Sequence, residues 1–357
     1  MNLRRIVVTF ALAFSLGVLV TVFVLQRPAW IAQEVEAAAQ AAAKGGETGA
    51  DASAPSTDAT PDADDGQSPE AKWPDDAGSP EQLLYSQAQM MDDAAAKLAP
   101  RTPGKTNLYV IAFAGDGAEN VFRNEAVYVE KLFSERFDAV GHTVVLINNP
   151  STLMQYPIAS LSNLQTAVND VAERMNGDED ILLLFLTSHG SRDHELYVAL
   201  DPLPLDQIAP DDLADLFTDT KIRNKVVVIS ACFSGGFIDA LKSPQTMVIT
   251  AARADRTSFG CGTRSPITDF GRAFFATGLN DNDNIPAAFA EARKLIDQWE
   301  TKAGEEHSEP QIATSPQIEE RLKAWRDGIH PGPPVPFEVR PASRRPADGV
   351  RTLSAAR

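Results

Sequence analysis

The sequence predicts an α/β protein with a mainly parallel sheet and helices on both of its faces. Short, uninterrupted apolar runs at residues 181–186 and 226–229 are typical of strands that are buried on both faces. Segments with helical spacing of apolar residues separate such runs, so that strands and helices alternate along the chain. The connection between these two runs is long enough for a right-handed crossover, which would make the two strands neighbours.

An uncharged apolar run occupies residues 6–25, directly after Arg4 and Arg5. Its length suits a hydrocarbon core, so we expect residues 1–30 to form a transmembrane signal anchor. No small-residue cleavage site follows the run; a signal peptide that is cleaved after secretion is the alternative. The two arginines favour the cytoplasm, which in a bacterium predicts a single-pass inner-membrane protein whose folded domain faces the periplasm.

Composition divides the rest of the chain. Residues 31–80 are rich in Ala, Asp, Ser and Pro and predict a disordered linker, and residues 81–106 are expected to contain a lead-in helix. We expect the folded domain at residues 107–328 and a disordered tail, rich in Pro and Arg, at residues 329–357. The formal charge of −17 argues against nucleic acid or anionic lipid as a partner, because phosphate binding needs clustered Lys and Arg.

Turn residues separate the expected elements of the domain. A Gly-Asp-Gly stretch at residues 115–117 ends the first strand, and Gly141 ends the first helix. A small hairpin is expected at residues 194–200. The expected strands lie at residues 108–114, 142–147, 181–186, 226–229 and 246–251, and the expected helices at residues 129–140, 161–175, 210–216, 267–278, 286–299 and 316–327.

An imidazole and a thiol follow the two apolar runs described first. His189 comes after the run at residues 181–186, and Cys232 comes after the run at residues 226–229. In open α/β sheets, ligands and catalytic groups gather at the carboxyl ends of the strands. A helix is expected to start just beyond Cys232, which would lower the pKa of the thiol. The pair therefore predicts a site with a thiol nucleophile.

Other interpretations of these residues exist. A single Cys is more often a small buried apolar residue, and Cys232 could instead form a disulfide with Cys261, the only other cysteine. His189 and His194 lie in a loop and hairpin rather than on one helix face, so they do not predict a metal site. We expect neither a metal nor a cofactor, because a thiol and an imidazole are sufficient for acyl transfer.

The stretches Ser-His-Gly at residues 188–190 and Ala-Cys-x-Ser-Gly at residues 231–235 resemble the motifs of peptidase family C13. This family contains the legumains and the catalytic subunit of the glycosylphosphatidylinositol transamidase, within the caspase-like group. The resemblance covers about residues 107–279 and implies a caspase-like three-layer sandwich. It also implies that Cys232 attacks a peptide carbonyl to form a thioester, that His189 is the acid and base, and that the N–H groups of Gly190 and Cys232 hold the oxyanion.

The resemblance extends to a pocket for the substrate residue before the cut. It implies that Arg123, Ser258 and Asp269 line this pocket, and that Ser230 stands where legumains carry a glutamate. The asparagine that orients the family's histidine is displaced, and Asn120 is the nearest replacement. A preference for Asn or Asp is therefore left open, and Arg123 and Asp269 could instead be a surface ion pair or helix-end charges.

Three functions follow as hypotheses. The first is a membrane-anchored cysteine endopeptidase that acts on a protein or peptide outside the cytoplasm. The second is a transpeptidase or transamidase that passes the same thioester to an amine. The third is a catalytically silent caspase-like scaffold, which the altered pocket favours and the intact His189 and Cys232 oppose. The sequence makes no prediction of the oligomeric state.

Overall fold

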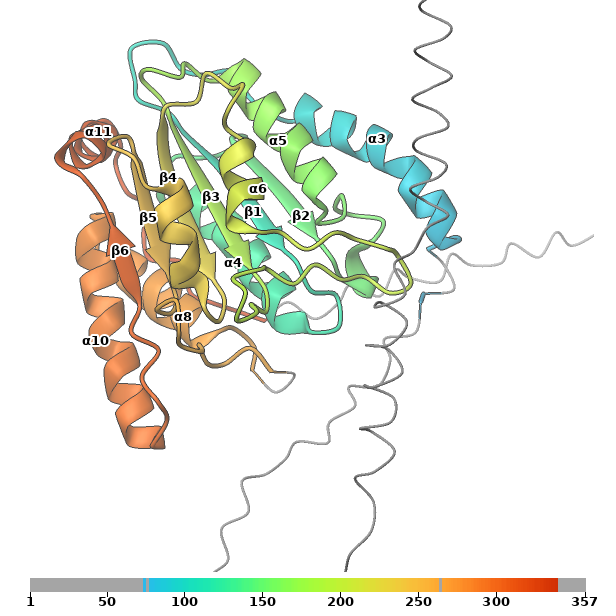
Figure 1. Ribbon diagram of the computed structural model, residues 1–357. Coiled ribbons are helices and arrows are strands. Elements are labelled where there is room, and N and C mark those ends of the chain that lie inside the picture. The colour runs from blue at the N-terminus through green and yellow to red at the C-terminus, as the bar shows by residue number, and fades with distance from the viewer. Residues whose placement is uncertain (1–72, 75–76, 263–264, 340–357) are drawn as a thin grey trace, which may run out of the picture. The chain divides into compact units, whose positions relative to one another are not determined.

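The computed structural model describes residues 73–74, 77–262 and 265–339 of the chain (Figure 1). The predicted anchor, most of the predicted linker and the end of the predicted tail lie outside these residues. Among the residues that the structure describes, no helix combines the length and the apolar character that crossing a membrane requires.

The centre of the domain is a six-stranded sheet in the order β2-β1-β3-β4-β5-β6. Strands β1 to β5 are parallel, and the edge strand β6 runs antiparallel to β5. The predicted mainly parallel sheet is thus confirmed. Strand β6 was not predicted from the sequence, because its three half-buried residues form no apolar run. The strands are β1 (Leu108–Ala114), β2 (Thr143–Ile147), β3 (Ile181–Thr187), β4 (Asn224–Ser230), β5 (Thr246–Thr250) and β6 (Gln311–Ala313).

Helices cover both faces of the sheet, as Figure 1 shows, and make a sandwich of three layers that is consistent with the caspase-like fold. Alternate residues of β1 point into two different cores, with Val110 on one side and Ile111 on the other. The Val110 side packs against α4 (Asn120–Arg136), α8 (Asp269–Gly271), the π-helix η3 (Arg272–Gly278), α9 (Leu279–Asp281), α10 (Ile285–Ala303) and α11 (Pro316–Asp327). The Ile111 side packs against α3 (Pro80–Ala96), α5 (Leu161–Arg174), α6 (Pro210–Asp215) and α7 (Ile238–Leu241).

The folded unit extends beyond both ends of the expected domain. The Gln87 side chain on α3 accepts from the backbone N–H of Ile158, which fixes this lead-in helix to the segment before α5. At the other end, Val335 is buried, and its carbonyl accepts from the Tyr128 hydroxyl at 2.8 Å. The predicted tail therefore starts too early: Ile329, Val335 and the partly buried Phe337 pack against the core of the domain.

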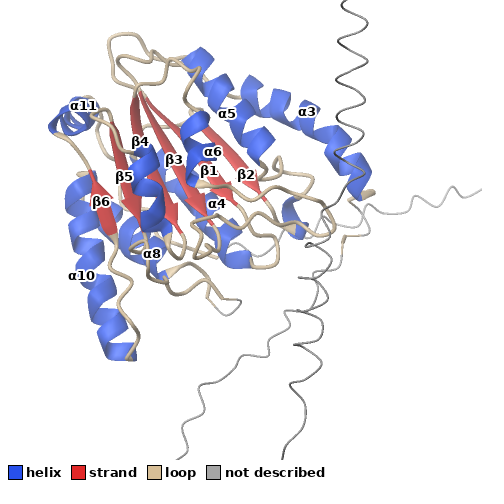
Figure 2. Cartoon of the chain, viewed as in Figure 1, coloured by secondary structure: helices blue, strands red, loops and turns tan. Residues whose placement is uncertain are grey.

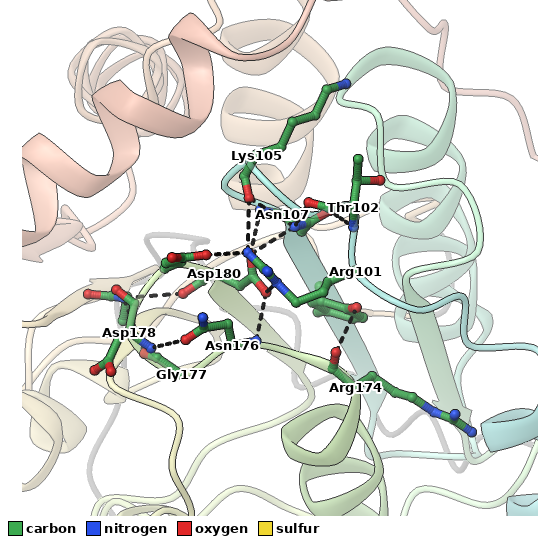
Figure 3. Close-up of polar contacts among 12 residues, drawn as sticks. Arg101, Thr102, Lys105, Asn107, Arg174, Asn176, Gly177, Asp178 and Asp180 are labelled. Carbon is green, nitrogen blue, oxygen red and sulfur yellow. Dashed lines mark hydrogen bonds and ion pairs between the residues drawn. The ribbon is translucent and has the colours of Figure 1, made fainter.

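A polar network closes the amino-terminal edge of the sheet (Figure 3). The fully buried Asp180, just before β3, accepts from Nε of Arg101 at 2.9 Å and from the backbone N–H of Asn107 at 2.8 Å. It also accepts from the backbone N–H of Asn176 at 2.7 Å. The network joins the starts of β1 and β3, and the strand arrows of Figure 2 end at the opposite edge of the sheet.

Candidate active site

His189 and Cys232 follow neighbouring strands. Strand β3 ends at Thr187 and β4 ends at Ser230, and these two terminal residues are paired in the parallel register. Each predicted catalytic residue lies two positions beyond its strand. The expected crossover therefore places the thiol and the imidazole at one edge of the sheet.

The half-buried thiol of Cys232 is held by the loop that follows β5. The backbone N–H of Ser258 donates to Sγ at 3.3 Å, and the Ser258 hydroxyl oxygen lies 3.7 Å from Sγ. The pKa of Cys232 is lowered from 9.0 to about 6, first by a hydrogen bond from the Cys261 thiol; burial opposes this shift, while Ser258 and the charge of His189 add to it. These contacts favour the thiolate form of Cys232.

Cys261 is a free thiol like Cys232, so the alternative of a disulfide between them is not realised here. The contact with Cys232 and burial raise the pKa of Cys261, which keeps this thiol protonated as a donor. The helix expected just beyond Cys232 is present but short: Phe233 has a φ of 56°, and the four-residue η2 (Ser234–Phe237) and the four-residue α7 follow. A neighbouring thiol, an amide and an imidazole lower the pKa of Cys232.

Two carboxylates face His189. Its Nε2 lies 2.9 Å from Oε2 of Glu119 and 3.7 Å from Oδ2 of Asp116, and Phe122 packs its ring edge against the imidazole. Because an ionised carboxylate only accepts, Nε2 is the donor, which leaves Nδ1 for proton transfer. Burial lowers the pKa of His189, but the hydrogen bond to Glu119 and the two negative charges outweigh it, so the pKa is raised overall. The imidazolium and the Cys232 thiolate are therefore favoured together.

The group that orients His189 differs from the expected one. Asn120 does not contact the imidazole; its side-chain oxygen accepts from Nδ2 of Asn149 at 3.2 Å. Glu119, the N-cap residue of α4, takes this place one position earlier. The chain thus has a charged partner for the imidazolium where the family resemblance implied an amide.

Asp116, Glu119 and His189 also place their potential ligand atoms within 4.8 Å of one another, a spacing that could hold a metal ion. A cation bound there would compete with the proton on Nε2, since both need the same lone pair. His194 lies apart from this group: its Nδ1 is 3.2 Å from the carbonyl oxygen of Phe233. The two carboxylates are explained without a metal by their interaction with the imidazolium.

Gly190 and Cys232 approach each other through the backbone. A Cβ on Gly190 would lie 2.1 Å from the Cys232 carbonyl oxygen, so no other residue fits at this position without a shift of the backbone. Within the described residues, the N–H of neither Gly190 nor Cys232 donates to another protein group. Two free N–H groups beside the thiol are what an oxyanion hole requires.

The family model of the peptidase C13 family matches residues 108–319. The chain belongs to the peptidase C13 family. Membership supports a caspase-like peptidase or transamidase type of function, of the cysteine peptidase class, with a protein as substrate. A search of curated proteins finds no match.

The implied pocket residues of this C13 domain fall into two groups. Ser258 contacts the Cys232 sulfur directly, and Ser230 lies beneath it, buried and 3.1 Å from the Thr268 hydroxyl oxygen. Asp269 begins the short helix α8 and pairs with Arg272 at 3.2 Å, as a helix-end charge would.

Arg123 has a different environment from Asp269, and the structure does not pair them. Its guanidinium donates to the Ser151 hydroxyl at 2.6 Å and to Oδ1 of Asn149 at 3.4 Å. The side chain is buried, and this burial lowers the pKa of Arg123. Its Nε and Nη2 donate to Oδ1 of Asn124 at 3.3 and 2.8 Å, and among the described residues no carboxylate forms an ion pair with this buried cation.

Four residues of the site were missed from the sequence: Asp116, Glu119, Glu125 and Cys261. The first two follow β1 at the same carboxyl edge as the catalytic pair, so the strand-end rule could have found them. Glu125 could have been noticed as an acid on the apolar face of α4, between the buried Phe122 and Val129. Cys261 was considered from the sequence only as a possible disulfide partner of Cys232, not as a donor to its sulfur.

Proposed function

We propose that this C13 protein is a membrane-anchored cysteine endopeptidase that hydrolyses peptide bonds outside the cytoplasm. The observation that supports it most is the pair at the ends of β3 and β4, a thiol with a lowered pKa and an imidazole with a raised pKa. Such a thiolate–imidazolium pair holds both a nucleophile and an acid ready before substrate binds.

The reaction begins when the Cys232 thiolate attacks the scissile carbonyl carbon. The carbonyl oxygen takes the negative charge, and the N–H groups of Gly190 and Cys232 donate to it. The imidazolium of His189 then gives a proton to the leaving amine, the C–N bond breaks and a thioester remains. Water attacks the thioester, His189 takes a proton from it, and the acid product leaves with the thiolate regenerated.

Glu119 acts through His189 in this scheme. By accepting from Nε2 it fixes the ring and leaves Nδ1 for the proton that moves. Asp116, at 3.7 Å, adds charge that favours the imidazolium. Burial raises the pKa of Asp116, while the His189 charge opposes this.

For the pocket, we propose that Arg123 donates to the side-chain carbonyl of an Asn or Asp residue before the cut, with Ser258 and Asp269 at its rim. The buried guanidinium has only neutral partners among the described residues, which supports this role. The buried Ser230 contributes to the pocket indirectly, through the contact of its hydroxyl group with the Thr268 hydroxyl.

For the location, we propose a single-pass anchor at residues 6–25 in a bacterial inner membrane, with the peptidase domain in the periplasm. The apolar run and the two preceding arginines support it. Secretion after cleavage of this segment is the alternative, and the mass of the mature N-terminus distinguishes the two.

The test uses the full chain in detergent and an acyloxymethyl ketone that carries Asn, Asp or Ala beside the reactive group. We expect the wild type to be labelled at Cys232, and His189→Ala to lose most of the labelling. Cys232→Ala should cleave no member of a peptide library; cleavage at the wild-type rate would refute the proposal. No reaction of Cys232 with any thiol-directed electrophile would favour the scaffold function. Ligated products in the presence of an added amine would identify a transpeptidase.

A further inference from the structure

Glu125 is a buried acid in the middle of the site. It lies on α4, and its exposed fraction is 0%. Its Oε2 accepts from the Thr187 hydroxyl at 2.8 Å, and its Oε1 accepts from the Thr268 hydroxyl at 2.9 Å. The Ser230 hydroxyl lies 3.5 Å from Oε1. A carboxylate with three hydroxyl groups around it and no exposed surface cannot contact a substrate itself.

The three hydroxyl groups belong to the segments that carry the site. Thr187 ends β3 two residues before His189, and Ser230 ends β4 two residues before Cys232. Thr268 is the N-cap of α8, where its hydroxyl oxygen accepts from the backbone N–H of Gly271 at 2.8 Å. The Glu125 carboxylate therefore joins the His189 segment, the Cys232 segment and the start of α8.

The fit around Glu125 is close. A Cβ on Gly271 would lie 2.0 Å from Oε1, so even alanine there would displace the carboxylate. The groups that face it from β3, β4 and α8 are uncharged. The first charged or titratable residues that follow Thr187, Ser230 and Thr268 in the chain are His189, Cys232 and Asp269.

Within the described part of the chain, the partners of the Glu125 carboxyl group are hydroxyl groups, and no cation pairs with it. Burial raises the pKa of Glu125 from 4.5 to about 7, and the bonds from Thr187, Thr268 and Ser230 only partly oppose the shift. Buried acids of this kind destabilise the ionised fold, and they occur most often where function needs them. A second buried glutamate, Glu300 on α10, accepts from the backbone N–H of Ser308 at 3.1 Å and offers a comparison away from the catalytic pair.

We propose that Glu125 is a positioning residue whose ionised carboxylate aligns His189 and Cys232 by holding the ends of their strands together. When the carboxyl group is protonated, one oxygen becomes a donor, and at least one of the three hydroxyl groups must turn away or change its role. The alignment of His189 and Cys232, and with it the rate of acylation, then depends on the protonation state of Glu125, although this residue does not contact the substrate. This role rests on the proposed peptidase function.

The experiment compares two reagents on the full-length protein from pH 5 to pH 9. A peptidyl acyloxymethyl ketone needs the aligned site, whereas iodoacetamide needs only the thiolate of Cys232. In the variant Glu125→Gln we expect labelling by the ketone at pH 8 to slow at least tenfold, and alkylation by iodoacetamide to change less than threefold. We expect labelling of the wild type to rise near pH 7, and this rise should disappear in the variant.

Two further variants complete the test. Glu300→Gln, which removes a buried acid outside the site, should keep the wild-type profile. Thr187→Val removes one donor to the carboxylate and keeps the acid, so its rise in labelling should move to higher pH. A Glu125→Gln variant with the wild-type profile, or an equal loss in Glu300→Gln, would overturn the role of Glu125. A wild type that reacts with iodoacetamide but with no peptidyl ketone would overturn the proposed function, and this role with it.

Discussion

Replacing Glu125 by Gln should stabilise the fold at alkaline pH although it impairs the site. The side chain keeps its size and loses the charge that burial disfavours. The rise in the pKa from 4.5 to about 7 means that the fold disfavours the ionised form of Glu125 by about 3 kcal/mol relative to the unfolded chain. Each pKa unit corresponds to about 1.4 kcal/mol. Because Glu125 is fully buried, solvent screening takes little from this figure.

The sign follows from proton binding. The folded wild type holds its proton on Glu125 more tightly than the unfolded chain, so its free energy of unfolding falls as the pH rises from 4.5 through 7. Between pH 5 and pH 8, the titration of Glu125 lowers the free energy of unfolding of the wild type by about 2.5 kcal/mol. The Gln variant lacks this group, so its free energy of unfolding does not change for this reason. The stability advantage of Glu125→Gln over the wild type should therefore grow by about that amount between the two pH values.

The assay is urea unfolding at pH 5 and pH 8 in the same detergent, followed by tryptophan fluorescence, for which the buried Trp325 is a suitable probe. Glu320→Gln, on the exposed surface of α11, controls for the loss of one negative charge. If the difference between Glu125→Gln and the wild type is the same at both pH values, the carboxyl group does not titrate in this range. The reasoning from its burial would then be wrong.

Three other predictions concern single contacts. Glu119→Gln should lower kcat/KM roughly 100-fold with little change in KM, because His189 loses a charged partner; an unchanged kcat would contradict the orienting role. Cys261→Ala should raise the pKa of Cys232 and slow its alkylation roughly fivefold at pH 6 but hardly at pH 9, and equal rates in both proteins at pH 6 would exclude the thiol contact as the cause. Asp180→Ala should lower the free energy of unfolding by about 3 kcal/mol, measured by urea unfolding, while labelling per folded molecule stays at the wild-type level, since the network lies at the other edge of the sheet.

The catalytic pair and its strands could be read from the sequence because they depend on local pattern. An apolar run of strand length that ends in a polar turn specifies both the strand and the edge where the next residues lie. One crossover rule then makes β3 and β4 neighbours. His189, Cys232 and the C13 motifs are therefore found without coordinates, and so is the mainly parallel sheet.

The partners of these residues were decided only by the tertiary structure. Glu119 reaches His189 across 70 positions of the chain, and Glu125 reaches Thr268 across 143. Such contacts depend on the rotation of α4 against the sheet and on the path of the loop after β5. Long-range packing sets both of these, and the pattern along a single segment does not contain them. The sequence by itself thus determined the candidate reactive residues and the edge of the sheet where they lie, and the packing decided which groups contact them.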